Sequence, residues 1–174
     1  LQEGIINRSG KIVPDSSPRN QNIDGIWRFM IAEKSEYDNK KEIYITETDI
    51  ENVITAKAAI YAAMKILLDR LDLSFSDIEQ FLIAGAFGSY LDIENAIAIG
   101  LIPDVERDRI SFVGNTSVRG AKIVAFYQEA LAVVEKIRSD TTYYDLMGAN
   151  DYVDEFRKAL FLPHTDIEQF MRKK

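Results

Sequence analysis

The sequence predicts an α/β domain in which helices flank a mixed, mostly parallel sheet. Two short apolar runs, residues 81–84 and 110–113, are each followed by a glycine, a pattern typical of strands that are buried on both faces in a parallel sheet. Helix signals lie before, between and after these two runs. Strands that alternate with helices along a chain favour a layered α/β architecture. We expect residues 1–174 to form a single domain.

The composition excludes several classes of function. Of the 174 residues, 47% are hydrophobic, which suffices for one globular core. Acidic residues outnumber basic ones by 28 to 21, and an acidic surface disfavours a nucleic-acid partner. With no cysteine and one histidine, these residues cannot hold a cysteine-ligated iron-sulfur cluster or a histidine-pair metal site. No apolar stretch reaches membrane-spanning length, so we predict a cytoplasmic location with no membrane partner and no metal site.

The start of the chain is predicted to be rich in β-structure. Turn-forming residues separate short β-prone runs there, and Asp24-Gly25 fits a tight turn between two of them. Residues 43–45 form a further short strand. We therefore divide the chain into a β-rich start, an αβ region and a polar tail, over residues 1–45, 46–163 and 164–174.

A long helix is predicted over residues 47–71. Thr46 and Asp49 form a capping-box pattern at its start, and apolar residues recur along it at helical spacing. Lys57 lies among alanines and isoleucines on this helix. Two interpretations of Lys57 stay open: its side chain extends to solvent, or it reaches a ligand bound beside the first parallel strand.

The second half of the chain is predicted to hold three further helices and one more strand. The helices cover residues 93–99 with Asp92 as N-cap, residues from Asn115 or Thr116 to about 138, and residues 151–160. The strand covers residues 142–146, with Tyr143 and Tyr144 in the core. We expect His164, the only histidine, to lie at the surface.

The two strands that end in glycine define the candidate site. In open α/β sheets ligands bind outside the carboxyl ends of the strands, so residues 85–89 and 114–116 should lie side by side at that edge. Glycine lets backbone amides approach a phosphate or ribose, and the following helix adds its positive end. The alternative is that both segments are only tight strand-to-helix turns. Acidic clusters such as Asp104 with Glu106 are expected to be solvated loops or caps.

Long ordered motifs cover residues 83–92, 95–96, 99–104, 112–116 and 120–122. They resemble the C-terminal domain of the reductive activators of corrinoid proteins, and further similarity extends the resemblance to nearly the whole chain. The resemblance implies a ribonuclease-H-like lobe of the superfamily that contains acetate and sugar kinases, actin and the heat-shock ATPases. In that superfamily ATP lies between two such lobes.

The resemblance also implies the site residues. Gly85, Ala86, Phe87 and Gly88 would form the turn that holds adenosine, with Ala86 replacing the second glycine of the usual pair. The neighbouring strand end would supply Gly114, Asn115 and Thr116, and Lys57 would line the nucleotide from the long helix.

The family couples hydrolysis of ATP, bound with Mg, to the reduction of a cobalt(II) corrinoid. The electron comes from an N-terminal domain that holds a 2Fe-2S cluster, and the partner is a corrinoid protein or a corrinoid-dependent methyltransferase. This sequence has no cysteine for the cluster and lacks the Asp-Gly-Thr hairpins of the first lobe. The resemblance therefore implies the second lobe alone, a C-terminal fragment of a longer protein that by itself does not hydrolyse ATP.

Two other functions remain open from the residues. One is a different enzyme of the same superfamily, such as a dehydratase activator or a small-molecule kinase. The other is a non-catalytic interaction domain that docks a partner through its acidic surface. A homodimer formed through alanine-rich helix faces is a further prediction.

Overall fold

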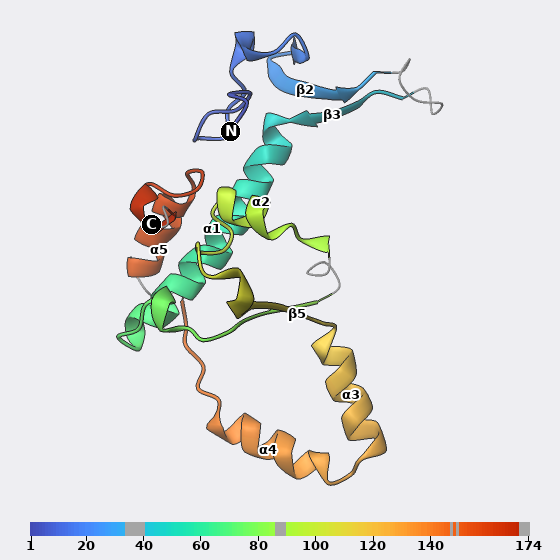
Figure 1. Ribbon diagram of the computed structural model, residues 1–174, viewed down its shortest axis with the longest axis vertical. Coiled ribbons are helices and arrows are strands. Elements are labelled where there is room, and N and C mark those ends of the chain that lie inside the picture. Colours follow the sequence, from blue (N-terminus) through green and yellow to red (C-terminus); the bar gives the residue numbers. More distant parts are fainter. Residues whose placement is uncertain (34–40, 86–89, 147, 149, 171–174) are drawn as a thin grey trace.

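The computed structural model of the protein describes residues 1–33, 41–85, 90–146, 148 and 150–170 (Figure 1). The strands are β1 (Asn20–Ile23), β2 (Ile26–Ala32), β3 (Ile43–Thr46), β4 (Phe81–Ala84) and β5 (Ile110–Gly114). The α-helices are α1 (Glu47–Arg70), α2 (Ile93–Ala98), α3 (Thr116–Phe126), α4 (Ala130–Asp140) and α5 (Asn150–Ala159). The short 3-10 helices are η1 (Pro14–Ser16), η3 (Phe75–Asp77), η5 (Arg107–Arg109) and η6 (Ile167–Phe170).

The strands at the start of the chain form a three-stranded antiparallel sheet in the order β1-β2-β3. Asp24 and Gly25 both have positive φ and join β1 to β2, as the predicted tight turn requires. Met30, in the middle strand, is buried. The strands predicted at the start of the chain are therefore present, and the division of the chain into three parts stays a prediction.

Helix α1 runs through the middle of the molecule, and α5 lies beside it (Figure 1). It begins with the predicted capping box: the Thr46 hydroxyl accepts from the Asp49 amide, and the Asp49 carboxylate accepts from the Thr46 amide. The hydrogen bonds that the Thr46 hydroxyl and the Thr46 amide donate to the Asp49 carboxylate lower the pKa of Asp49. The side of α1 that faces the core buries the residues Ile50, Ile54, Lys57, Ala58, Tyr61, Ala62 and Ile66.

Strands β4 and β5 form a two-stranded parallel sheet that is separate, among the described residues, from the antiparallel one. Helix α2 packs against one end of one face, where Ile110 contacts a cluster centred on Ala96 and Ile97. The other face is open, and the Leu82 side chain is 59% exposed. The prediction that these strands are buried on both faces is wrong, because no described helix packs on that second face.

Two predictions for the second half are also wrong. The helix predicted to run to about residue 138 breaks at residues 127–129 into α3 and α4, where Tyr127 has extended backbone angles. Residues 142–146 form no strand, and Tyr143 is 85% exposed. Residues with high β-propensity form a strand only where another strand can pair with them, and no strand of the described residues lies beside this segment.

The chain after α5 folds back onto α1. Phe170 and His164 pack their rings against Tyr61, at centroid distances of 5.2 Å and 5.3 Å. Gly100 has positive φ and lies so close to Pro163 that a Cβ atom would overlap the Pro163 carbonyl. In the part of the chain that is described, no helix has the length and apolarity needed to cross a membrane.

Candidate functional site

The carboxyl ends of β4 and β5 lie side by side, as predicted. The Gly85 amide donates to the Gly114 carbonyl at 2.8 Å. Both glycines have positive φ, +106° and +67°, and a Cβ atom at either would point into open space. The backbone is therefore bare at both strand ends, in a conformation that favours glycine.

Helix α3 begins directly at this edge. The Asn115 side chain caps the helix by accepting from the Val118 amide at 3.0 Å, and Thr116 is the first helical residue. Both side chains are exposed. The amino end of an α-helix carries a partial positive charge, which favours a phosphate or another anion beside it.

Arg119 also lies at this edge and was missed by the sequence reasoning. Its Nη1 lies 3.5 Å from the Val113 carbonyl of β5, within reach of the strand ends. The position of Arg119 in the sequence could have revealed it, because a residue four positions after the N-cap Asn115 lies one helical turn from the start of α3. Arg119 adds a fixed positive charge to the amino end of α3.

Three of the predicted site residues, Ala86, Phe87 and Gly88, lie outside the described residues. Gly85, Gly114, Asn115 and Thr116 are the members of the predicted set that the structure brings together.

Lys57 lies elsewhere, under the C-terminal segment. It is 1% exposed, and its Nζ donates to the carbonyl oxygens of Phe161 and Pro163, each at 2.6 Å. Burial lowers the pKa of Lys57 from 10.5 to about 8. The ammonium neither extends to solvent nor points to the strand ends, and its hydrogen bonds hold the chain end on α1.

Arg8 completes this arrangement from the N-terminal turn. Its guanidinium donates to the carbonyls of Leu162, at 3.2 Å, and His164. Two cations thus bind four consecutive carbonyl oxygens, which we call the carbonyl clamp: residues 161–164 held by Arg8 and Lys57. Hydrogen bonds from charged donors are stronger than neutral ones, so the clamp fixes this segment firmly.

His164 is fully buried, so the prediction that it lies at the surface is wrong. Its Nδ1 accepts from the Asp166 amide at 3.1 Å, which places a proton on Nε2, and Nε2 lies 3.2 Å from Glu155 Oε1. Contact with His164, reinforced by Lys158, lowers the pKa of Glu155 to about 2 against the effect of burial. Nothing in the sequence around His164 has the periodicity that would have signalled its burial.

The acidic clusters have arginine partners. Arg107 binds Glu94 at 2.6 Å and Asp104 at 2.7 Å, which raises its pKa, and Arg109 binds Glu106 at 3.2 Å. Among the residues that the structure describes, no group of three or more histidines or carboxylates could hold a metal ion.

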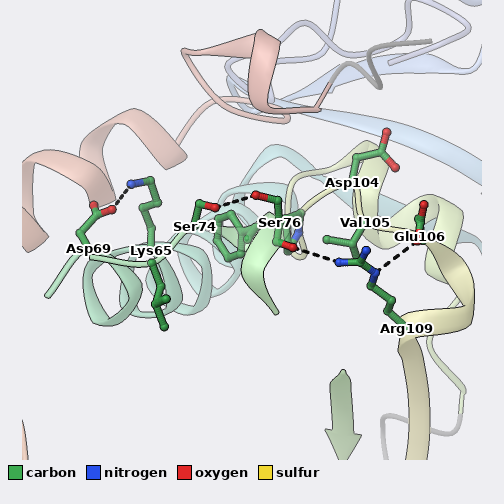
Figure 2. Close-up of a pocket in the computed structure, with 11 residues that line it drawn as sticks. Lys65, Asp69, Ser74, Ser76, Asp104, Val105, Glu106 and Arg109 are labelled. Carbon is green, nitrogen blue, oxygen red and sulfur yellow. Dashed lines mark hydrogen bonds and ion pairs between the residues drawn. The ribbon is translucent and has the colours of Figure 1, made fainter. Parts of the chain in front are cut away.

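A pocket of about 550 Å³ lies between the end of α1 and the loop that carries Asp104 to Arg109 (Figure 2). Its polar groups bind one another: Lys65 pairs with Asp69, the hydroxyls of Ser74 and Ser76 lie 2.7 Å apart, and Arg109 donates to the Ser76 carbonyl. None of the predicted site residues lines it. The glycine-ended strands therefore remain the candidate site.

Comparisons with known proteins identify the family. A family model described as the C-terminal domain of RACo, the ASKHA domain, matches residues 1–174. The chain belongs to this family. Membership confirms the resemblance to reductive activators of corrinoid proteins and the actin- and sugar-kinase-like α/β fold.

Several proteins resemble this RACo C-terminal domain. The corrinoid activation enzyme RamQ of Eubacterium limosum is 34% identical over 165 residues, which are 90% of this chain and 28% of RamQ. The Co(II) methylated amine-specific corrinoid protein reductase of Methanosarcina barkeri is 34% identical over 62% of this chain and 20% of its own length. A solved reductive activator for corrinoid, iron-sulfur protein matches 98% of the chain with a TM-score of 0.90 and 42% identity. This match covers 27% of that structure, so the chain spans about a quarter of the length of these relatives.

Proposed function

We propose that the chain is the nucleotide-side lobe of an ATP-dependent reductive activator of corrinoid proteins, with a corrinoid protein as its partner. Family membership and the names of the relatives support the role in corrinoid activation. The observation that carries the nucleotide site is the pair of bare glycine ends, Gly85 and Gly114, beside the start of α3.

In this proposal the backbone of the strand ends contacts the nucleoside, since no side chain at Gly85 or Gly114 would keep a ligand away. The amino end of α3 and Arg119 favour the negative charge of the phosphates. ATP, when bound, supplies binding and hydrolysis energy, and stronger binding to one lobe arrangement than to another drives a conformational change. We assign no role in this site to Lys57, because its ammonium is occupied in the carbonyl clamp.

The proposed reaction needs two further groups, a 2Fe-2S cluster and Mg. The chain has no cysteine, so the 2Fe-2S cluster would belong to another part of an activator. Among the described residues, no group of three or more histidines or carboxylates could hold a metal ion. We propose that the Mg bound with ATP contacts the phosphates rather than a carboxylate cluster of this chain. Cytoplasmic location and self-association stay predictions.

Replacing Gly114 with valine tests the site. In the full gene product, we expect Gly114→Val to weaken ATP binding at least about tenfold, or roughly 1.4 kcal/mol, because the branched side chain fills the space above the strand ends. Binding is followed as the rise in Tm with ATP concentration.

Gly4→Val is the matched control. Gly4 also has positive φ, +70°, with open space around it, so valine brings the same backbone strain far from the strand ends. Equal ATP affinity of wild type and Gly114→Val would refute the site. A full gene product whose Tm does not respond to ATP would favour the non-catalytic interaction domain.

A further inference from the structure

The pocket of about 550 Å³ lies at the edge of the β4–β5 sheet opposite the glycine ends (Figure 2). Its walls include η3, which precedes β4, and Arg109, which directly precedes β5. These residues mark the amino ends of both strands, whereas Gly85 and Gly114 lie at the carboxyl ends. The volume falls in the range of roughly 300–1,000 Å³ that is usual for small-molecule sites. We call this cavity the amino-edge pocket.

Hydrogen bonds between two loops fix the walls of the amino-edge pocket. Nη1 of Arg109 donates to the carbonyls of Ser76 and Ile78, each at 3.1 Å, and so ties the loop before β5 to the loop before β4. At η3, Ser74 and Asp77 form a capping box, in which the Ser74 amide donates to the Asp77 carboxylate at 2.8 Å. A cavity whose walls are already held in place binds a ligand at little cost in ordering.

The charged groups of the amino-edge pocket form two ion pairs. Lys65 pairs with Asp69 on α1, and Arg109 pairs with Glu106 at 3.2 Å. Both pairs are partly exposed, and exposed pairs of this kind contribute little to stability. A ligand can therefore replace either partner. A ligand that carries both charges can replace both partners at once, whereas a simple anion or cation would leave one of them unpaired.

Within each pair the cation is more buried than the carboxylate. The Lys65 side chain is 27% exposed, against 46% for Asp69. The Arg109 side chain is 34% exposed, against 60% for Glu106. A ligand that enters from solvent therefore meets the carboxylates at the rim and reaches the cations with its leading end. This order favours a carboxylate at the leading end and an ammonium at the rim.

The remaining lining suits an apolar group. It includes the side chains of Leu73, Phe75, Pro103 and Val105. The Phe75 ring is held against the ring of Tyr61, at a centroid distance of 5.6 Å. A third carboxylate of the lining, Asp104, already binds Arg107 at 2.7 Å and so adds no net charge. The pocket thus combines balanced charges of both signs with an apolar wall.

We infer that the amino-edge pocket binds a free α-amino acid with an apolar side chain. The carboxylate of the amino acid binds the cations, Lys65 and Arg109. Its ammonium binds the carboxylates at the rim, Asp69 and Glu106, and its side chain lies against Phe75. The inference rests on this lining alone and not on nucleotide binding, so either proposal can fail without the other.

Titration calorimetry of the full gene product, without nucleotide, tests the site. L-phenylalanine and L-leucine are the probes, and we expect at least one of them to bind with a Kd of about 1 mM or tighter. The N-acetyl derivative of that amino acid lacks the ammonium, and its amide lacks the carboxylate, so each should bind at least about tenfold more weakly. Failure of both amino acids to bind would overturn the inference, as would equal binding of the derivatives.

Lys65→Met locates the site, because it removes a cation of the pocket and should weaken amino-acid binding at least about tenfold. Asp69→Asn should weaken binding of the amino acid but not of its N-acetyl derivative, which has no ammonium to pair. Lys136→Met is the matched control, since Lys136 and Asp140 form another exposed i,i+4 pair, and it should bind like the wild type. Unchanged affinity in Lys65→Met or Asp69→Asn, or an equal loss in the control, would overturn the inference.

Discussion

Lys57 illustrates how one residue can take a role that its sequence context does not reveal. Alanine and isoleucine neighbours predict a core-facing helix side, yet they cannot say which group meets the ammonium there. Its acceptors, the carbonyls of Phe161 and Pro163, are more than one hundred residues away in the chain. Burying a charged amine is costly, and these two charge-assisted hydrogen bonds offset part of that cost.

The low pKa of Lys57 predicts a pH dependence of stability. Between pH 8 and pH 10 the unfolded chain, whose lysine has a pKa of 10.5, binds more protons at this site than the folded chain. The free energy of unfolding should therefore rise with pH in this window through Lys57, and Lys57→Met should remove that contribution. Above pH 10 the raised pKa of Tyr61 acts in the opposite direction, because the unfolded chain loses that proton first.

Urea denaturation of wild type and variant at steps of pH between 7.5 and 10 measures the effect. Lys136→Met, which removes an exposed lysine of α4, is the control and should keep the slope of the wild type. Identical slopes for Lys57→Met and wild type would show that the Lys57 ammonium is not desolvated.

Helices and strands whose sequence signals lie within a few residues were predicted well, whereas features that depend on distant segments were not. The start and end of α1 follow from a capping box and from apolar spacing, both of which act within a few residues. The break between α3 and α4 and the absence of a strand at residues 142–146 depend on which elements lie nearby. Propensity alone cannot supply a partner strand or a helix face to pack on.

The capping box gives a prediction about α1. Thr46→Ala removes the hydroxyl that accepts from the Asp49 amide, and we expect a loss of about 1 kcal/mol in the free energy of unfolding. Thr55→Ala is the control, because the Thr55 hydroxyl bonds only to the Glu51 carbonyl on an exposed side of the same helix. Denaturation curves that rank the control as the more damaging change would contradict the role of the cap.

Over the whole molecule, the geometry at the candidate site was predicted in part, and its role in binding stays a proposal. The adjacent glycine ends of β4 and β5 follow from the rule that parallel strands present their carboxyl ends at one edge. Arg119, the carbonyl clamp and the contact of His164 with Glu155 depend on how distant segments pack, which no local pattern encodes.

Gly100 follows α2 in the chain and packs against Pro163 of the C-terminal segment. A substitution at Gly100 therefore tests how α2 and the C-terminal segment hold together. Gly100→Ala adds a methyl group that overlaps the Pro163 carbonyl in a backbone conformation that L side chains rarely adopt. We expect a loss of roughly 2 kcal/mol in thermal or urea denaturation. Gly4→Ala has a similar φ without the overlap, so a similar loss in both variants would mean that the contact with Pro163 contributes nothing.

The carbonyl clamp also bears on the order of events during synthesis. Its acceptors, residues 161–164, and the ring of Phe170 that covers Tyr61 leave the ribosome after almost all the rest of these residues. At roughly 5–20 residues per second, α1 is made several seconds before the segment that covers it. A nascent chain therefore holds an α1 that lacks this part of its cover until residues 161–170 emerge, and the core around Tyr61 closes only after they do.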